Sequence, residues 1–377
     1  MNLRRFKMKK TRRDFLKSAG LSAVAAGAVM GGGRLAHSAE ETWKWKGQTF
    51  SSRGNRFFEQ SEDFAFMIDK YTNGRVKCDV HQAGEIVPAG QVFDAAGQGI
   101  IDFGMGCPCL MKSKAYGAQL YCDAPGIQSP IEKIIWYYNG GGKELFEEIV
   151  HKKYNAHPLY SQAATAEIWL FSNKKINSIE DIKGMKMRAA GIRGEVLQKM
   201  GMSVVVLPEP EIVPAVERKV IDAMEYSSIN CTFPIGFQDV TKYIYIHPLK
   251  APSSMLLWAV NLDKWNKLPA DIKKAIERAS RDVVLRSVAW GIEQDTLTLK
   301  KAVEEKKNEV FILPEKIVKV FDEAAADYYY EKAKTDQITA DILASWAKFK
   351  KAYGKYASYI DLFNITGNRI GLLKGAS

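Results

Sequence analysis

The sequence predicts an α/β protein with two lobes of related design and long helices at its C-terminal end. Three observations lead to this prediction: strand-like patterns alternate with helix-like patterns, the alternation occurs in two separate passages, and two long helical patterns follow. The chain has 377 residues, enough for two domains, and its 46% hydrophobic and 26% charged residues are typical of a globular protein.

The first passage contains three predicted strands and two predicted helices. Apolar and polar residues alternate at 43–48, and the apolar residues of 56–71 follow helical spacing. Asn73-Gly74 predicts a turn, and the pattern continues with a strand at 75–80, a helix at 92–97 and a strand at 100–104. This β-α-β-α-β order favours a mostly parallel sheet.

The second passage repeats this order before the chain becomes helical. It predicts strands and helices in alternation at 185–189, 194–200, 204–207, 211–218 and 223–226. Residues 269–307 predict one long helix, or two with a kink, and Pro269 lies near its start, where proline is favoured. A further helical region covers 315–353. These long helices can brace the lobes or form an oligomer contact.

The first 39 residues have the pattern of an export signal. Basic residues come first, small and weakly apolar residues fill 19–33, and small residues near Ser38 and Ala39 suit cleavage. The segment Arg12-Arg13-Asp14-Phe15-Leu16-Lys17 resembles the twin-arginine signal, which exports folded proteins to the periplasm. We therefore expect a periplasmic protein that begins near residue 40.

The net charge of +11 does not indicate nucleic-acid binding. Residues 1–39 hold nine Lys and Arg against one Asp, which leaves 45 basic and 42 acidic residues for the rest of the chain. The basic excess thus lies mainly in the segment expected to be removed, and no nucleic-acid partner is expected. No apolar run after residue 40 approaches the ~20 residues that a membrane span needs.

The cysteines and histidines form no recognised catalytic or metal motif. The five cysteines are an odd number, which leaves at least one thiol free in an oxidising compartment. Cys107 and Cys109 are too closely spaced for a C-x-x-C motif; they can be small buried apolar residues, or either can form a disulfide with Cys122. The sequence contains no H-E-x-x-H, no G-x-S-x-G and no phosphate-binding glycine loop.

Two predicted strand ends carry polar residues of interest. Arg188 ends a strand and precedes a loop and helix, and ligands of open α/β sheets collect at the carboxyl ends of strands. An arginine there can hold a carboxylate through two parallel hydrogen bonds. Glu225 and Tyr226 end the strand at 223–226. Taken alone, such an arginine is more often a solvated charge or surface ion pair.

Seven short segments follow one another in a distinctive order and spacing: 83–88 (AGEIVP), 93–95 (FDA), 136–142 (WYYNGGG), 183–188 (KGMKMR), 208–215 (PEPEIVPA), 221–225 (IDAME) and 260–265 (VNLDKW). Together they resemble the solute-binding subunits of tripartite ATP-independent periplasmic (TRAP) transporters, especially the branch that binds 2-oxo acids. This resemblance implies a two-lobed periplasmic binding protein fold that closes over an organic acid and delivers it to a membrane permease.

The resemblance also implies site residues. Arg188 corresponds to the arginine that pairs with the ligand carboxylate, and Glu225-Tyr226 to an acid–aromatic pair whose acid helps hold a cation on the ligand. Glu167 corresponds to a further polar residue of the site and, with Glu225, would be a metal ligand. The first strand–helix loop, which reaches the cleft in this family, carries Ser51 and Ser52.

Two segments depart from the pattern of the branch. Ala251 stands at the place of the second cation-binding acid, and Cys109-Leu110 replaces an aromatic pair. A ligand carboxylate ~4 Å from Glu225 would be repelled by roughly 4 kcal/mol at an effective dielectric constant near 20, so a positive charge is needed between them. Either Na⁺ or Ca²⁺ on Glu167 and Glu225 supplies it, or the ammonium group of Lys250 does, or neither is present.

We therefore expect a receptor without enzymatic activity that binds a small organic acid for a TRAP permease. An exported enzyme and a solute sensor that feeds a signalling partner are the alternatives. If the chain is organised as in this family, it consists of the signal (1–39), lobe I (40–165 and 252–291), lobe II (166–251) and the bracing and C-terminal helices (292–377). The long helices leave room for a homodimer.

Overall fold

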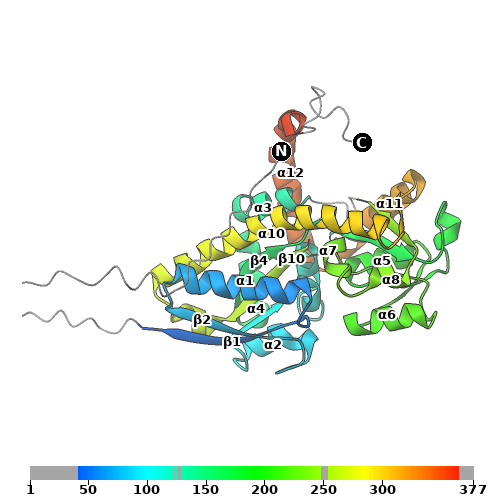
Figure 1. Cartoon of the computed structure of the whole chain (residues 1–377). Helices are drawn as coiled ribbons and strands as arrows, with labels where there is room; N and C mark the ends of the chain where they lie inside the picture. The colour runs from blue at the N-terminus through cyan, green and yellow to red at the C-terminus, as the bar shows by residue number, and fades with distance from the viewer. Residues whose placement is uncertain (1–40, 123, 126–128, 248–253, 365–377) are drawn as a thin grey trace, which may run out of the picture. The chain divides into compact units, whose positions relative to one another are not determined.

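The computed structural model describes residues 41–122, 124–125, 129–247 and 254–364, which hold two β-sheets with helices packed against each (Figure 1). The predicted signal at 1–39 lies outside these residues. The α/β class and the two-lobe organisation predicted from the sequence are confirmed.

The sheet of the first lobe has five strands in the order β2-β1-β3-β10-β4. The strands are β1 (Trp43–Thr49), β2 (Val76–His81), β3 (Phe103–Gly106), β4 (Ala156–Ala163) and β10 (Met255–Asn261). Strand β1 pairs in parallel with β2 and β3, with Trp43 opposite Val76 and Gly47 opposite Phe103. Strand β10 is antiparallel to both of its neighbours. This sheet is therefore mixed, with one reversed strand, rather than simply parallel.

The interior strand β10 is apolar up to its last residue, Asn261, because both of its edges are paired and both of its faces are covered. All seven of its residues are buried. The rings of Trp258 and Phe103 stack with centroids 3.8 Å apart. On the neighbouring strand, a side chain at Gly104 would lie 2.1 Å from the carbonyl oxygen of Val92, so glycine is required for helix α2 (Val92–Gly97) to pack this closely.

Helix α1 (Arg56–Tyr71) forms where the helical spacing of its apolar residues predicts it. Asn55 is the N-cap, and its side chain accepts a hydrogen bond of 2.9 Å from the backbone N–H of Phe57. The apolar stripe, which includes Phe64 and Ile68, is buried against the sheet. The remaining helices of this lobe are α3 (Pro130–Asn139), α4 (Gly142–Tyr154) and α9 (Leu262–Asn266).

The sheet of the second lobe has six strands in the order β11-β9-β5-β8-β6-β7. The strands are β5 (Ile168–Ser172), β6 (Lys186–Arg188), β7 (Ser203–Val205), β8 (Ala223–Met224), β9 (Tyr243–Ile246) and β11 (Glu309–Ile312). Strands β6, β7 and β8 are mutually parallel neighbours, whereas β5 runs antiparallel to β8 and β9. The helices are α5 (Gly191–Lys199), α6 (Glu209–Glu217), α7 (Ile229–Thr232) and α8 (Phe237–Val240). Each sheet thus has one reversed strand, β10 in the first and β5 in the second.

The chain passes between the two sheets at adjacent points. It leaves the first sheet after Ala163 and enters the second at Ile168, and it is back in the first sheet at Met255. The backbone N–H of Ala164 donates to the carbonyl of Ser254 over 2.8 Å, so the two crossing segments are joined. This arrangement brings Glu167 and Ser254 together between the lobes.

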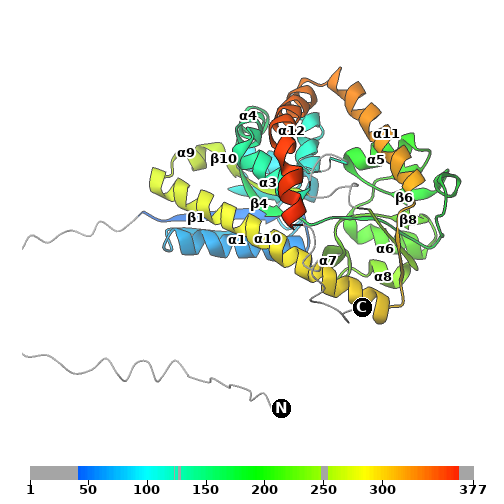
Figure 2. The ribbon, with the colours of Figure 1, turned by 90° about the horizontal axis from the view of Figure 1, so that it is seen from above.

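Helix α10 (Ala270–Glu304) is a single helix that runs along both lobes (Figures 1 and 2). Its first half packs against α1 and β4, and its later part contacts α7, with Ala302 in the apolar core of the second lobe. The helix therefore continues without a break across residues 291 and 292, where the predicted domain boundary lies.

The region at 315–353 differs from its prediction because it contains two helices. They are α11 (Glu315–Ala333) and α12 (Gln337–Asn364). The break occurs at Asp336, whose carboxylate accepts a hydrogen bond of 2.7 Å from the backbone N–H of Thr339, as a helix-capping residue does. Among the described residues, no helix is both long enough and apolar enough to cross a membrane.

Candidate functional site

A cavity of about 590 Å³ lies between residues of the two lobes. The second lobe contributes the carboxyl end of β6, the start of α5, the segment before α6 and the segment after β8. The first lobe contributes the β1–α1 loop and the segment around Cys107–Leu110. Most of the wall is apolar. Ser52 is a polar group from the first lobe, and the other polar groups lie in the second lobe or in the segments that cross between the lobes: Glu167, Arg188, Arg193, Glu209, Tyr226, Ser227 and Ser254.

Arg188 is the last residue of β6 and lies on the cavity wall, although only 7% of its surface is exposed. Its Nε donates to the carbonyl of Leu207 over 3.2 Å, and its Nη1 donates to the carbonyl of Glu225 over 2.6 Å. Its Nη2 makes no hydrogen bond to the described part of the chain. Burial and the neighbouring Arg193 lower the pKa of Arg188 to about 10, so it remains charged at neutral pH.

Glu225 lies directly behind Arg188, at the end of the neighbouring strand β8. It is fully buried and does not reach the cavity surface. Its Oε1 accepts hydrogen bonds from the backbone N–H of Ala190 over 3.1 Å and from Nη1 of Arg188 over 3.3 Å. Glu225 therefore holds Arg188 in position on the cavity wall.

Arg193 was not singled out in the sequence, yet it is central to the site. It lies in the first turn of α5, is 5% exposed, and lines the cavity. Its Nη1 contacts Oε2 of Glu167, and its Nη2 contacts Oε2 of Glu225. The only sequence signal was its place five residues after Arg188, in the helix that follows the same strand.

Glu167 completes a cluster of two arginines and two glutamates. Besides its contact with Arg193, its Oε1 accepts a hydrogen bond of 2.6 Å from the hydroxyl of Ser254. Buried carboxylates are stable only when they are paired or well hydrogen-bonded, and each oxygen of Glu167 and Glu225 has at least one protein donor. The structure thus brings together Arg188, Glu167 and Glu225, which the sequence proposed as site residues, with Arg193, which it did not.

Glu209 is a second group on the wall that the sequence did not single out. Its Oε2 accepts hydrogen bonds from the Asn55 amide over 2.8 Å and from the Tyr226 hydroxyl over 3.3 Å. Burial raises the pKa of the Glu209 carboxyl above its usual value. Since Asn55 belongs to the first lobe and Glu209 to the second, their contact joins the two sides of the cavity.

Of the other residues predicted for the site, some line the cavity and some do not. Tyr226 and Ser52 line the cavity. Ser51 is 1% exposed and is not among the lining residues described, and its hydroxyl has no hydrogen-bond partner within the described chain. Lys250 and Ala251 lie outside the described residues.

Three cysteines form part of the first-lobe wall. The sulfur atom of Cys107 contacts those of both Cys109 and Cys122, and the sulfurs of Cys109 and Cys122 are 3.9 Å apart. A sulfur atom takes part in only one disulfide, so the two contacts of Cys107 represent alternative disulfides. Of the two pairings that the sequence left open, Cys107–Cys122 is one of these alternatives, whereas Cys109 contacts Cys107 and is not bonded to Cys122.

Comparison with known proteins identifies the family. Residues 48–336 match the family described as bacterial extracellular solute-binding protein, family 7. The chain belongs to this family, the solute-binding receptors of TRAP transporters. A curated relative from Nostoc sp., described as a monocarboxylate 2-oxoacid-binding periplasmic protein, is 26% identical over 82% of this chain and 84% of its own.

Solved structures of TRAP receptors have the same fold. One from Pseudoalteromonas atlantica T6c, with bound sodium and pyruvate, has a TM-score of 0.80 and 25% identity, covering 86% of this chain and 99% of its own. One from Bordetella bronchiseptica RB50, a dimer with calcium and picolinate in an active site, has a TM-score of 0.81 and 23% identity, covering 86% and 96%. In these receptors, a calcium or sodium ion accompanies the bound acid.

The carboxylates of this chain do not fit such a cation in the arrangement observed. Ca²⁺ takes six to eight oxygen ligands, whereas the oxygens of Glu167 and Glu225 are directed at protein donors, including the Arg193 guanidinium. At an effective dielectric constant near 20, a cation ~4 Å from that guanidinium would be repelled by roughly 4 kcal/mol if monovalent and by roughly 8 kcal/mol if divalent.

Proposed function

We propose that this TRAP receptor captures a small organic acid with an apolar body in the periplasm and delivers it to the membrane permease. The observation that carries the proposal is the position of Arg188. Its guanidinium is buried on the cavity wall and fixed by protein contacts, and its Nη2 has no hydrogen-bond partner in the described chain. A fixed arginine of this kind suits a carboxylate, because little side-chain freedom is lost on binding.

The shape and chemistry of the cavity support an acid with an apolar body. The apolar part of the wall includes Phe50, Phe57 and Leu110 from the first lobe and Val206 and Leu207 from the second. A volume of about 590 Å³ exceeds the need of a three-carbon acid. Each Å² of apolar ligand surface buried here would contribute about 25 cal/mol of favourable free energy to binding.

Closure of the lobes around the ligand would complete its binding. The two crossing segments meet near Ala164 and Ser254, and the lobes also touch through Asn55 and Glu209. A hinge at the crossing segments would allow ligand entry and would bury the bound carboxylate on closing. Membership in a receptor family favours this transport role over the exported enzyme considered from the sequence.

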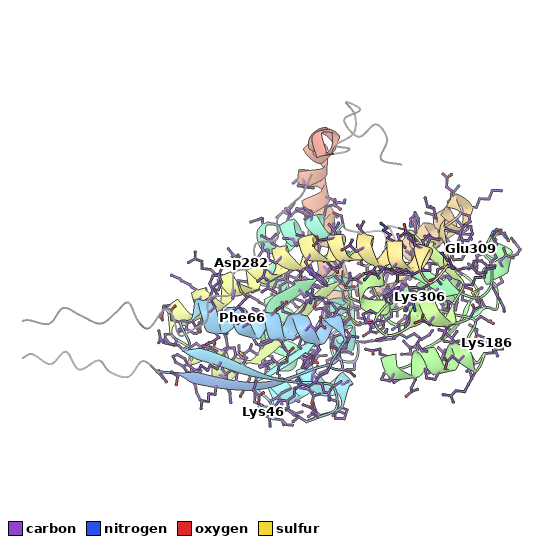
Figure 3. All side chains as sticks on the ribbon, viewed as in Figure 1. Lys46, Phe66, Lys186, Asp282, Lys306 and Glu309 are labelled. Carbon is purple, nitrogen blue, oxygen red and sulfur yellow. A yellow bond between two sulfur atoms is a disulfide. The ribbon has the colours of Figure 1, made fainter. Side chains whose placement is uncertain are left out.

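Ligand screening with a matched pair of variants tests the proposal. Thermal shift and calorimetry would compare pyruvate, 4-methyl-2-oxopentanoate, picolinate and pyroglutamate against the wild-type protein, Arg188→Ala and Lys186→Ala. Lys186 is exposed on the same strand of the second lobe (Figure 3). We expect at least one acid to bind the wild type and Lys186→Ala, with a loss of 30-fold or more in Arg188→Ala. Equal binding by both variants would contradict the assigned role of Arg188.

Three further features belong to this proposal. Export would follow the twin-arginine route, which peptide mapping of the mature N-terminus and a Lys-Lys replacement of Arg12-Arg13 would test.

The permease would recognise the closed receptor. A homodimer, as named for the Bordetella bronchiseptica structure, would appear as a doubled mass in light scattering.

A further inference from the structure

We infer that the guanidinium of Arg193 takes the place of the metal ion that solved relatives hold beside the ligand, so this receptor binds its organic acid without a metal cofactor. The inference rests on the proposed function, because it concerns the same cavity. It is carried by the contacts of Arg193 with Glu167 and Glu225.

Arg193 supplies a positive charge between the two carboxylates that were expected to hold a cation. Its two terminal nitrogens are directed at different partners, Nη1 at Glu167 and Nη2 at Glu225. The planar fork of a guanidinium suits this bridging role, since its N–H groups point in fixed and separate directions. One side chain therefore does what a bound ion would otherwise do for the two acids.

The remaining oxygens of the two carboxylates are also satisfied by the protein. Oε1 of Glu167 accepts from Ser254 over 2.6 Å, and Oε1 of Glu225 accepts from the backbone N–H of Ala190 over 3.1 Å. An incoming cation would have to displace Arg193, and the displaced guanidinium, now 5% exposed, would need a new partner. The cluster is thus complete before any ion arrives.

The charges of the cluster agree with this arrangement. Arg188 and Arg193 carry two positive charges, and Glu167 and Glu225 carry two negative charges. The ligand carboxylate would approach Arg188 and Arg193 from the cavity, where both line the wall, close to the N-terminal end of α5. Because the positive charge of Arg193 is part of the protein, the affinity for the ligand does not depend on which metal ions the medium contains.

The experiment compares ligand binding with and without metal ions. Wild-type protein is treated with EDTA, exchanged into sodium-free choline chloride buffer and titrated with pyruvate and 4-methyl-2-oxopentanoate, and then with the same acids plus 1 mM CaCl₂ or 100 mM NaCl. We expect the affinity of the wild type to change by less than twofold. Elemental analysis of the protein before EDTA treatment should find less than 0.1 calcium per chain.

Variants of Arg193 make the outcome decisive. Arg193→Ala removes the bridging charge, so we expect its binding to fall at least tenfold without metal and to recover at least fivefold with CaCl₂. Arg193→Lys keeps a positive charge and should remain less dependent on calcium, which preserves the test if the alanine variant does not fold. Loss of wild-type binding after EDTA treatment, with recovery on adding either ion, would overturn the inference. Absence of wild-type binding under every condition would instead overturn the proposed function.

Discussion

The guanidinium of Arg188 binds Glu225 twice, through the backbone carbonyl at 2.6 Å and through the carboxylate at 3.3 Å. Arg188 ends β6 and Glu225 directly follows the parallel neighbour β8, with Arg188 paired in register with Met224. The strand ends thereby fix the direction of the arginine, and this cavity-lining group depends on an acid that does not itself reach the cavity. Removing that acid should therefore affect stability as well as binding.

Replacing Glu225 with glutamine should destabilise the protein. The change removes the carboxylate that pairs with both Arg188 and Arg193, and breaking one member of a buried ion cluster costs about 3 kcal/mol. Chemical denaturation of the ligand-free protein measures this difference. Glu211→Gln, an exposed change at the start of α6, is the matched control and should shift stability by less than about 0.5 kcal/mol. Equal stabilities for both variants would show that the buried cluster contributes nothing.

Binding of an anionic ligand should strengthen as the pH falls from 7 towards 5. Burial raises the pKa of Glu209, so this carboxyl takes up a proton at a higher pH than an exposed glutamate and removes a negative charge from the cavity wall. Because its folded-state pKa is raised, the same group favours folding at low pH and loses this contribution as the pH rises through its folded pKa. Calorimetric titrations from pH 7 to pH 5 should show the trend in the wild type and a flatter one in Glu209→Gln. An identical slope in both proteins would assign the effect to another group.

Asn55→Asp should weaken ligand binding with little change in stability. The aspartate keeps an oxygen to cap α1, but it replaces the amide donor that binds Glu209 with a repelling charge. Closure across the cavity should become less favourable, and affinity should fall several-fold. Asn55→Ala is the comparison: it loses the cap as well, so it should also lower the free energy of unfolding by about 1 kcal/mol. Unchanged affinity in both variants would show that the Asn55–Glu209 contact is not used in closure.

The cysteine cluster should contain no more than one disulfide. Cys107 can pair with either Cys109 or Cys122, and each choice leaves the third cysteine reduced. Cys78 and Cys231 are free, and burial raises the pKa of Cys231 to about 12, which makes it a poor nucleophile. Alkylation of the unfolded, unreduced protein should label three thiols, and peptide mass spectrometry should identify the partner of Cys107. Labelling of a single thiol would require a second disulfide that includes Cys78 or Cys231.

Local sequence patterns were sufficient for most of the elements. The apolar stripe of α1, the Asn73-Gly74 turn and the Pro269 start of α10 all lie where they were predicted. The strand expected at 100–104 lies instead at Phe103–Gly106, because Ile100 is 59% exposed and pairing begins only where the chain meets β1 and β10. The break at Asp336 was missed because the capping residue stands within a continuous helical pattern.

The sequence by itself determined the two-lobe α/β architecture, the family, and the presence of an arginine at the end of β6, since these depend on residue order and short-range periodicity. Only the tertiary structure decided what surrounds that arginine. Glu167, Arg193 and Glu225 come from three separate segments, and their contacts arise because two crossing segments and two strand ends meet between the lobes. Electrostatic pairing depends on distances in space, which spacing along a chain does not specify.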